Sequence, residues 1–224
     1  MLLLVACAGP TDVVGPSSVD TPRTGTSTSS ASAGSPEATL ATTPGSPAYS
    51  SWPLGKRVLP LRVDGFGEIR PTPPSLRDRR YPTADVLPPP ADGGFEATIG
   101  PITPAIRDRM GETYQPGCPV ALDDLRYVLV SFRGFDGAAH TGELVVAASA
   151  AQAVVTVFRR LFRSDFPIES MRLITTADLV APATGDGNNT AAFVCRPTRG
   201  ESDGFSAHAY GLAVDLNPFL NPYL

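Results

Sequence analysis

A histidine and an aspartate, His208 and Asp215, lie seven residues apart close to the end of the printed sequence. An imidazole nitrogen and a carboxylate oxygen are ligands that zinc accepts in proteins. Gly211 lies between them, and glycine permits the sharp approach of backbone that two converging ligands need. The pair is a candidate metal site. Taken alone, a histidine and an aspartate at this spacing are more often ordinary surface residues.

The residues between and after this pair predict how it is positioned. Leu212, Val214 and Leu216 alternate along the chain, which is typical of one face of a strand. Asp215 is out of phase with them and is expected to point to the opposite face. A turn that carries His208 and feeds this strand would let the imidazole reach back to the carboxylate.

The whole string from Ser206 to Asp215 is far more specific than the pair, because it reads S-x-H-x-x-G-x-A-x-D. This string resembles the signature of the D-alanyl-D-alanine carboxypeptidase-like zinc peptidases, which include VanY-like enzymes and L-alanyl-D-glutamate endopeptidases. The resemblance covers roughly residues 52–224. Other stretches that resemble the actinobacterial branch of this family are Pro116 to Pro119, His140 to Leu144, Asn188 to Thr190, Phe193 to Arg196, Leu216 to Pro218 and Asn221 to Tyr223.

The resemblance implies a zinc ion held by two histidines and an aspartate, with an acidic general base. His208 and Asp215 match two of these ligands, and the third ligand and the base normally come from a later E-x-x-H or D-x-x-H element. No such element is present before Leu224, and the chain has only two histidines. We therefore expect a C-terminally truncated family member that is inactive as this fragment. His140 is expected to have a structural role, donating to Glu143 or to a backbone carbonyl, and the alternative is a metal ligand.

Two further residues receive a role from the resemblance. It implies that Arg196 binds the substrate carboxylate or stabilises the developing oxyanion, for which the planar guanidinium is suited. The alternative for Arg196 is a surface salt bridge. Ser206 is expected to contact substrate through its hydroxyl, or else to cap the turn. No nucleophile motif such as G-x-S-x-G is present.

The substrate that the resemblance implies is the stem peptide of peptidoglycan, cut at a D-Ala-D-Ala or an L-Ala-D-Glu bond. Zinc would provide metal-assisted hydrolysis of the peptide bond. The alternative function is a non-catalytic module that binds the cell wall and has a degenerate metal site.

The N-terminus predicts the location of the protein. The stretch Leu4 to Cys7 has the form of a bacterial lipobox, so Cys7 is a candidate for lipidation and for anchoring the chain to the outer face of the cytoplasmic membrane. The alternative is an incidental cysteine. The apolar run before Cys7 is too short to span a bilayer and lacks the basic residues of a secretory signal. We therefore expect the natural start to lie upstream of Met1.

Composition limits the remaining possibilities. The chain has 224 residues, of which 42% are hydrophobic and 18% charged, which allows one globular domain and a tail. The net charge of -4 argues against nucleic acid as a partner. We expect a partial lipoprotein signal in residues 1–7, a disordered Ser/Thr/Pro-rich linker in 8–50, a Pro-rich wrap in 51–115 and an incomplete peptidase core in 116–224. The alternative for the proline-rich part of the wrap is a second disordered linker.

Hydrophobic spacing predicts an α+β fold. Strands are expected at 122–132 and 144–147, joined by a turn at 134–137. A helix is expected to begin at the capping-box spacing of Ser149 and Gln152 and to end by 165–167. Further strands are expected at 171–176 and 191–196. The pattern favours a small antiparallel sheet with helices on one side, as the resemblance to the hedgehog and DD-peptidase class of folds also implies.

The cysteines fit an exported domain. With Cys7 set aside for a lipid, Cys118 and Cys195 are the only pair left that could bridge within the domain. In an oxidising compartment the two could form a disulfide, and closing so long a loop contributes on the order of 4 kcal/mol in the chain-entropy model. The alternative is two buried thiols.

Overall fold

The computed structural model describes residues 58–63, 65, 68, 83–182, 187–198 and 204–221. Cys7, the linker predicted for residues 8–50 and most of the first half of the predicted wrap lie outside the described residues. Within the described part of the chain, no helix is both long enough and apolar enough to cross a membrane.

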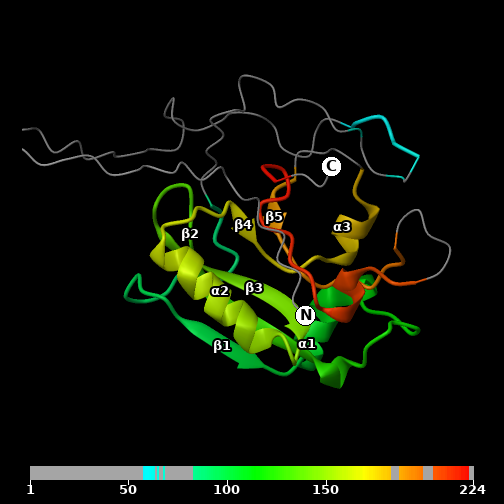
Figure 1. Ribbon diagram of the computed structural model, residues 1–224, viewed down its shortest axis with the longest axis horizontal. Helices are drawn as coiled ribbons and strands as arrows, with labels where there is room; N and C mark the ends of the chain where they lie inside the picture. Colours follow the sequence, from blue (N-terminus) through cyan, green and yellow to red (C-terminus); the bar gives the residue numbers. More distant parts are fainter. Residues whose placement is uncertain are drawn as a thin grey trace, which may run out of the picture. The chain divides into compact units, whose positions relative to one another are not determined.

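A three-stranded antiparallel sheet forms the centre of the fold (Figure 1). Its strands are β1 (Ala97–Gly100), β2 (Leu125–Arg133) and β3 (Ala139–Ala147), in the order β1-β2-β3. The predicted hairpin is therefore confirmed, with β3 longer than expected and a short 3-10 turn, η3 (Leu122–Asp124), ahead of β2. The strand within the predicted Pro-rich wrap, β1, is an edge strand, where missing backbone donors are tolerated. The fold class is α+β, as predicted.

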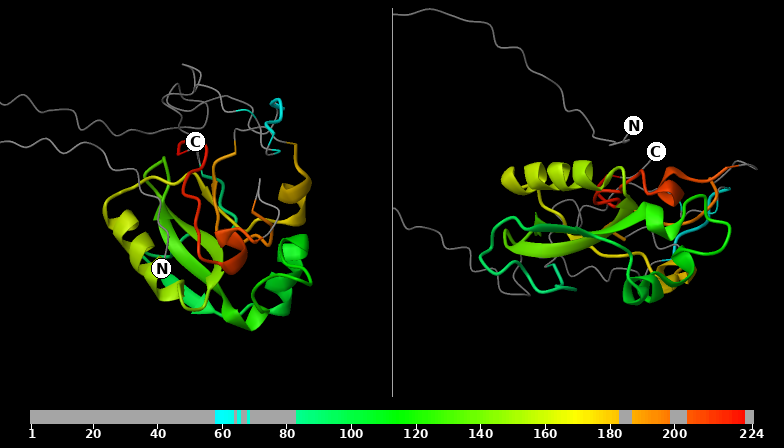
Figure 2. Two further views of the ribbon diagram at one scale, coloured as in Figure 1. Left: turned by 45° about the vertical axis from the view of Figure 1, so that its right-hand side comes forward. Right: turned by 90° about the horizontal axis from the view of Figure 1, so that it is seen from below.

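The helix α2 (Ala151–Arg163) lies along one face of the sheet (Figures 1 and 2). Val154, Val155 and Phe158 form its buried stripe and belong to a cluster with the inward side chains of β2 and β3. The predicted capping box is wrong, because the N-cap is Ala150 and no side chain caps the helix. The helix starts instead from a tight turn in which the Ala150 N–H donates to the carbonyl of Ala147 at 2.9 Å.

A second buried cluster lies on the other face of β3. It includes α1 (Pro104–Met110), and the short 3-10 turn η2 (Gly111–Thr113) follows that helix. The buried members of this cluster are Met110, Leu125, Val145, Leu173, Phe193 and Cys195.

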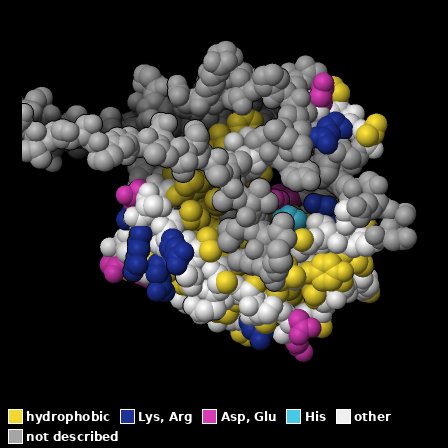
Figure 3. All heavy atoms as spheres, in the orientation of Figure 1, with side chains coloured by type: hydrophobic (Ala, Val, Ile, Leu, Met, Phe, Trp, Pro, Cys, Tyr) yellow, Lys and Arg dark blue, Asp and Glu magenta, His cyan; other side chains and the backbone are white. Residues whose placement is uncertain are grey.

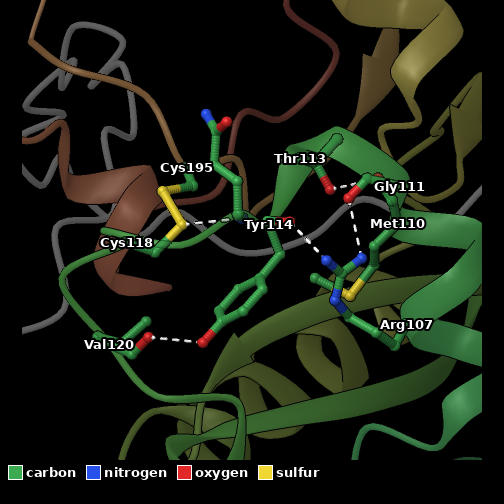
Figure 4. The surroundings of a disulfide bond; sticks show 9 residues. Arg107, Met110, Gly111, Thr113, Tyr114, Cys118, Val120 and Cys195 are labelled. Atoms are coloured by element: carbon green, nitrogen blue, oxygen red, sulfur yellow. Dashed lines mark hydrogen bonds between the residues drawn. A yellow bond between two sulfur atoms is a disulfide. The ribbon is translucent and has the colours of Figure 1, made fainter.

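The predicted disulfide between Cys118 and Cys195 is present beside this cluster, with Cα atoms 5.7 Å apart (Figure 4). Tyr114 lies next to it and donates its hydroxyl to the carbonyl of Val120 at 3.2 Å. Arg107 donates to the carbonyl of Tyr114 at 2.8 Å. The disulfide thus fixes the segment that follows α1 to the segment that carries Arg196.

The strand predicted at 171–176 is wrong for most of its length. The regular strand there is only β4 (Ser170–Met171), and α3 (Thr176–Val180) begins where the strand was expected to end. The helix begins there because Thr175 and Asp178 form a capping box. Arg172 holds Asp178 in place with a hydrogen bond of 2.7 Å, and this bond is the main reason that the pKa of Asp178 falls to about 2.

The strand predicted at 191–196 is also wrong. The regular strand is β5 (Asn189–Thr190), which pairs in parallel with β4. Beyond it the chain makes single contacts with different partners: Ala191 pairs with Asp215, and the Cys195 N–H donates to the carbonyl of Thr113 at 2.8 Å. Because no single strand runs beside residues 192–196, no ladder forms there.

A buried carboxylate joins α1 to the sheet. Glu143 on β3 is 1% exposed, and the Arg109 guanidinium donates to both of its oxygens. The Tyr127 hydroxyl donates to the same carboxylate at 2.5 Å, and the Leu173 N–H donates at 3.4 Å. Burial of Tyr127, and its hydrogen bond to the negative Glu143, raise the pKa of Tyr127 to about 12.

We expect Glu143→Ala to lower the free energy of unfolding by about 3 kcal/mol, because it leaves a guanidinium and a hydroxyl, both partly buried, without their acceptor. Urea denaturation measures this change. Glu112→Ala removes an exposed carboxylate from η2 and is expected to change stability by less than about 0.5 kcal/mol. Equal effects of the two substitutions would contradict a structural role for the Glu143 cluster.

Candidate metal centre

His208 is carried by a short 3-10 turn, η4 (Ala207–Tyr210). The turn begins at Ser206, whose hydroxyl accepts a hydrogen bond from the His208 N–H at 3.4 Å. Ser206 therefore takes the capping role that the sequence left open beside substrate contact. The turn ends at Gly211, whose φ of 66° lies in the left-handed region that favours glycine.

Gly211 is needed for a second reason, which is the close approach of β3. Its carbonyl accepts a hydrogen bond from the Ala147 N–H at 2.9 Å. A Cβ atom added at Gly211 would lie 2.4 Å from that same nitrogen. The end of β3 and the histidine turn therefore pack together only because this position has no side chain.

The two candidate ligands are attached to neighbouring residues, Ala191 and Ala192. The backbone of Asp215 exchanges two hydrogen bonds with that of Ala191, at 3.1 and 2.8 Å. The Nδ1 atom of His208 lies 2.6 Å from the carbonyl oxygen of Ala192. One dipeptide next to β5 thus fixes the strand position of the carboxylate and the orientation of the imidazole.

The side chains of His208 and Asp215 meet, with Nε2 and Oδ2 3.4 Å apart. When Nδ1 donates its proton to a carbonyl, a neutral imidazole presents the lone pair of Nε2 as a ligand. Two ligand atoms of a tetrahedral zinc, each about 2.0 to 2.1 Å from the metal, are separated by about 3.3 Å. The observed spacing therefore suits two ligands of one zinc ion.

Asp215 lies on the face that the alternation of apolar residues predicts, opposite Val214 and Leu216. Val214 and Leu216 pack against the α2 cluster, while the Asp215 side chain is 60% exposed. The segment is not a continuous strand but pairs with Ala191 through an isolated bridge. On the face shown in Figure 3, a histidine side chain is visible with acidic and basic side chains beside it.

The pKa of His208 is raised above its usual value by a balance of opposing effects. Burial of the ring is the largest effect and lowers the pKa. The hydrogen bond to Asp215, its negative charge and the Ala192 carbonyl together outweigh burial, and the positive charge of Arg196 opposes them. Without a cation, His208 and Asp215 therefore favour an ion pair.

Arg196 lies close enough to His208 for its charge to affect the imidazole. Its carbonyl accepts a hydrogen bond from the Ser206 N–H at 3.1 Å, and Pro197 pairs with Phe205. The guanidinium itself donates to the Pro197 carbonyl at 3.3 Å. This short antiparallel contact keeps Arg196 beside the histidine turn.

Within the described ranges, no group of three histidine, cysteine, aspartate or glutamate side chains is placed to hold a metal ion. His208 and Asp215 are the pair of candidate ligands that this part of the chain brings together.

His140 has a different role from the ligands, but its predicted partners are wrong. Its Nδ1 lies 2.8 Å from Asp85 and its Nε2 lies 3.1 Å from Asp136. Glu143 is not a partner, because residues three apart on β3 point to opposite faces of the sheet. His140 instead joins the hairpin turn to the segment before β1.

No protein-family model matches this chain. No curated protein and no solved structure matches it either. The case for a function therefore rests on the geometry of His208, Asp215 and Arg196 and on the signature that contains the first two.

The sequence did not reveal the Ala192 carbonyl, because a backbone acceptor leaves no mark in residue type. The polar residues Asn188 and Asn217, which pack around the Asp215 segment, were visible only as parts of stretches that resemble the family.

The pKa of His208 predicts a pH-dependent contribution of Asp215 to stability. Because the folded-state pKa is raised, this contribution is complete below the ordinary pKa of about 6.5 and is lost as pH rises through the folded-state value. We expect Asp215→Asn to destabilise the protein more at about pH 5 than at about pH 9 in urea denaturation. In a His208→Gln background the same substitution should show no such pH dependence. An equal effect at both pH values in the His208 protein would contradict the pairing.

Substitution of Gly211 tests the close packing of the histidine turn. We expect Gly211→Ala to cost at least about 2 kcal/mol of unfolding free energy, through both the left-handed backbone and the contact with Ala147. Gly137→Ala is the matched control, because Gly137 also has a positive φ but no atom within 4 Å of the added Cβ. Thermal unfolding of both variants should show a clearly larger loss for Gly211→Ala.

Proposed function

We propose that this chain is a zinc-dependent peptidase that acts on the stem peptides of cell-wall peptidoglycan, of the D,D-carboxypeptidase or L-Ala-D-Glu endopeptidase type. The observation that supports this proposal is the 3.4 Å approach of Nε2 of His208 to Oδ2 of Asp215, with Nδ1 held by a carbonyl. Together the two contacts fix the imidazole so that Nε2 faces the carboxylate.

His208 and Asp215 would hold the zinc ion. When bound, zinc lowers the pKa of a water molecule and polarises a peptide carbonyl. The Ala192 carbonyl keeps the proton of the imidazole on Nδ1, so that Nε2 is available as a ligand. Cation binding competes with the proton that Asp215 stabilises on His208, so affinity for the cation rises with pH.

Arg196 would bind an anionic group of the substrate. Its guanidinium is partly exposed and acts electrostatically on His208, so an anion next to the imidazole also feels the positive charge of Arg196. A carboxylate at the end of a stem peptide, or the oxyanion that develops during hydrolysis, provides such an anion. Cys7, outside the described residues, would keep the domain at the outer face of the membrane through a lipid.

The third ligand and the general base are proposed to come from a D/E-x-x-H element in a longer form of the protein, as in the family that the signature resembles. The 224 residues themselves contain only two histidines, neither in such an element. We therefore expect this chain to bind zinc weakly and to show no turnover.

The test compares this chain with one extended along the reading frame beyond Leu224, using a muropeptide that ends in D-Ala-D-Ala and one with an L-Ala-D-Glu bond. The extended chain should cleave one of them, chelator should abolish cleavage, and His208→Ala or Asp215→Asn should reduce kcat by at least about a hundredfold. Robust chelator-sensitive cleavage by the 224-residue chain would contradict the missing-ligand argument.

A second candidate is a non-catalytic module that binds the cell wall. This candidate needs no complete metal site, and among the described residues no group of three histidine, cysteine, aspartate or glutamate side chains is placed to hold a metal ion. A stop codon directly after Leu224, together with binding to purified peptidoglycan that His208→Ala leaves unchanged, would favour this module over the enzyme.

A further inference from the structure

The segment after Asp215 is held by a network of buried polar side chains that the proposed chemistry does not use. Its members are Glu169, Asn188, Thr190 and Asn217, each at most 6% exposed. Burying so many polar groups is unfavourable unless each finds a partner. The hydrogen bonds of this network therefore fix the position of the backbone closely.

Asn217 is the centre of this network. Its Oδ1 accepts from the Glu169 N–H at 3.2 Å, and its Nδ2 donates to the Pro167 carbonyl at 2.8 Å. Its own N–H donates to the hydroxyl of Thr190 at 3.1 Å. The side-chain amide of Asn217 thus joins the segment before β4 to a position two residues after Asp215, and its backbone N–H joins the same position to β5.

Asn188 holds the same segment two residues further along. Its Oδ1 accepts from the Phe219 N–H at 3.0 Å, and its Nδ2 donates to Glu169 at 2.7 Å. Figures 1 and 2 show the C-terminal segment, in red, running beside β5. Residues 215, 217 and 219 are therefore tied in turn to residues 191, 190 and 188.

Side chains take over this pairing because the backbone cannot continue it. Asn217 has a φ of 43°, in the left-handed region, and Pro218 has no N–H to donate. The backbone ladder beside Asp215 consists of the two bonds with Ala191. The direction in which the exposed Asp215 side chain points thus depends on how firmly the residues before and after Asp215 are held.

We infer that Asn217 and Asn188, with Thr190 and Glu169, are positioning residues for the metal ligand Asp215. The inference rests on the proposed function, since it requires that His208 and Asp215 bind a cation. The network holds Ala191 and Asp215 in one register, and Ala192 holds His208. The separation of the two ligand atoms is therefore set by the network and not by contacts of the Asp215 side chain alone.

The test is a titration of the 224-residue chain with zinc. Binding is monitored by NMR chemical shifts, which make weak binding measurable. Asn217→Gly keeps the left-handed backbone and removes the amide, and we expect it to weaken zinc binding by about ten- to a hundredfold. Asn221→Gly is the matched control, because Asn221 lies in the same segment but is exposed. It should change affinity by less than about twofold.

Cobalt absorption spectra give a second readout, because the visible bands of cobalt report its coordination geometry. A changed spectrum in Asn217→Gly, beside an unchanged one in Asn221→Gly, supports a positioning role over general loss of stability. If Asn217→Gly does not fold, Thr190→Val is the variant that tests the positioning role. It removes only the acceptor of the Asn217 N–H and nearly preserves the shape of the side chain. It should weaken zinc binding at least severalfold.

The outcomes separate the two proposals. Zinc binding that depends on His208 and Asp215 but is unchanged in a folded Asn217→Gly or Thr190→Val protein overturns the positioning role and leaves the proposed function standing. Zinc shifts that are the same in wild type, His208→Ala and Asp215→Asn overturn the proposed function, and the positioning role with it.

Discussion

The pairing of Asp215 with Ala191, next to the bond between His208 and the Ala192 carbonyl, is the constraint on which the candidate site depends. Ala191 and Ala192, which are adjacent in the chain, each hold one of the two candidate ligands. Any movement of this dipeptide moves both candidate ligands together, so their separation is preserved better than their position. The exposed side chain of Asp215 therefore needs few contacts of its own to be positioned beside His208.

The rest of the fold fixes that dipeptide from two directions. Upstream, β5 pairs with β4, and the buried asparagine network joins both to the end of the chain. Downstream, the disulfide at Cys195 connects the segment that carries Arg196 to the residues after α1. The carboxylate of Glu143 joins α1 in turn to β2 and β3. Much of the architecture around the sheet therefore serves to hold a stretch that has almost no regular secondary structure.

The electrostatics of the site follow from unequal exposure. The His208 side chain is mostly buried, whereas the Asp215 side chain is 60% exposed, so the pair is open to solvent on the side of the carboxylate. Burial alone would leave the imidazole neutral, but the neighbouring carboxylate and carbonyl favour its charged form. Arg196 reduces this preference. These opposing effects leave the pKa of His208 raised, although burial is the largest single effect. In the proposed zinc site, this raised pKa would make the proton a competitor of the metal for the imidazole.

Residue order by itself determined the elements whose signal is local. Alternation of apolar residues gave the β2–β3 hairpin, the helical stripe gave α2, and the ten-residue signature gave His208, Asp215 and the glycine between them. Tertiary structure alone decided what depends on partners distant in sequence. A capped helix and single contacts occur where strands were expected near residues 171 and 191. His140 pairs with Asp85 and Asp136. The Ala192 carbonyl orients the imidazole of His208. A local pattern records which face of an element is apolar, but a backbone carbonyl or a bridging carboxylate is selected only when the chain folds and brings it within hydrogen-bond distance.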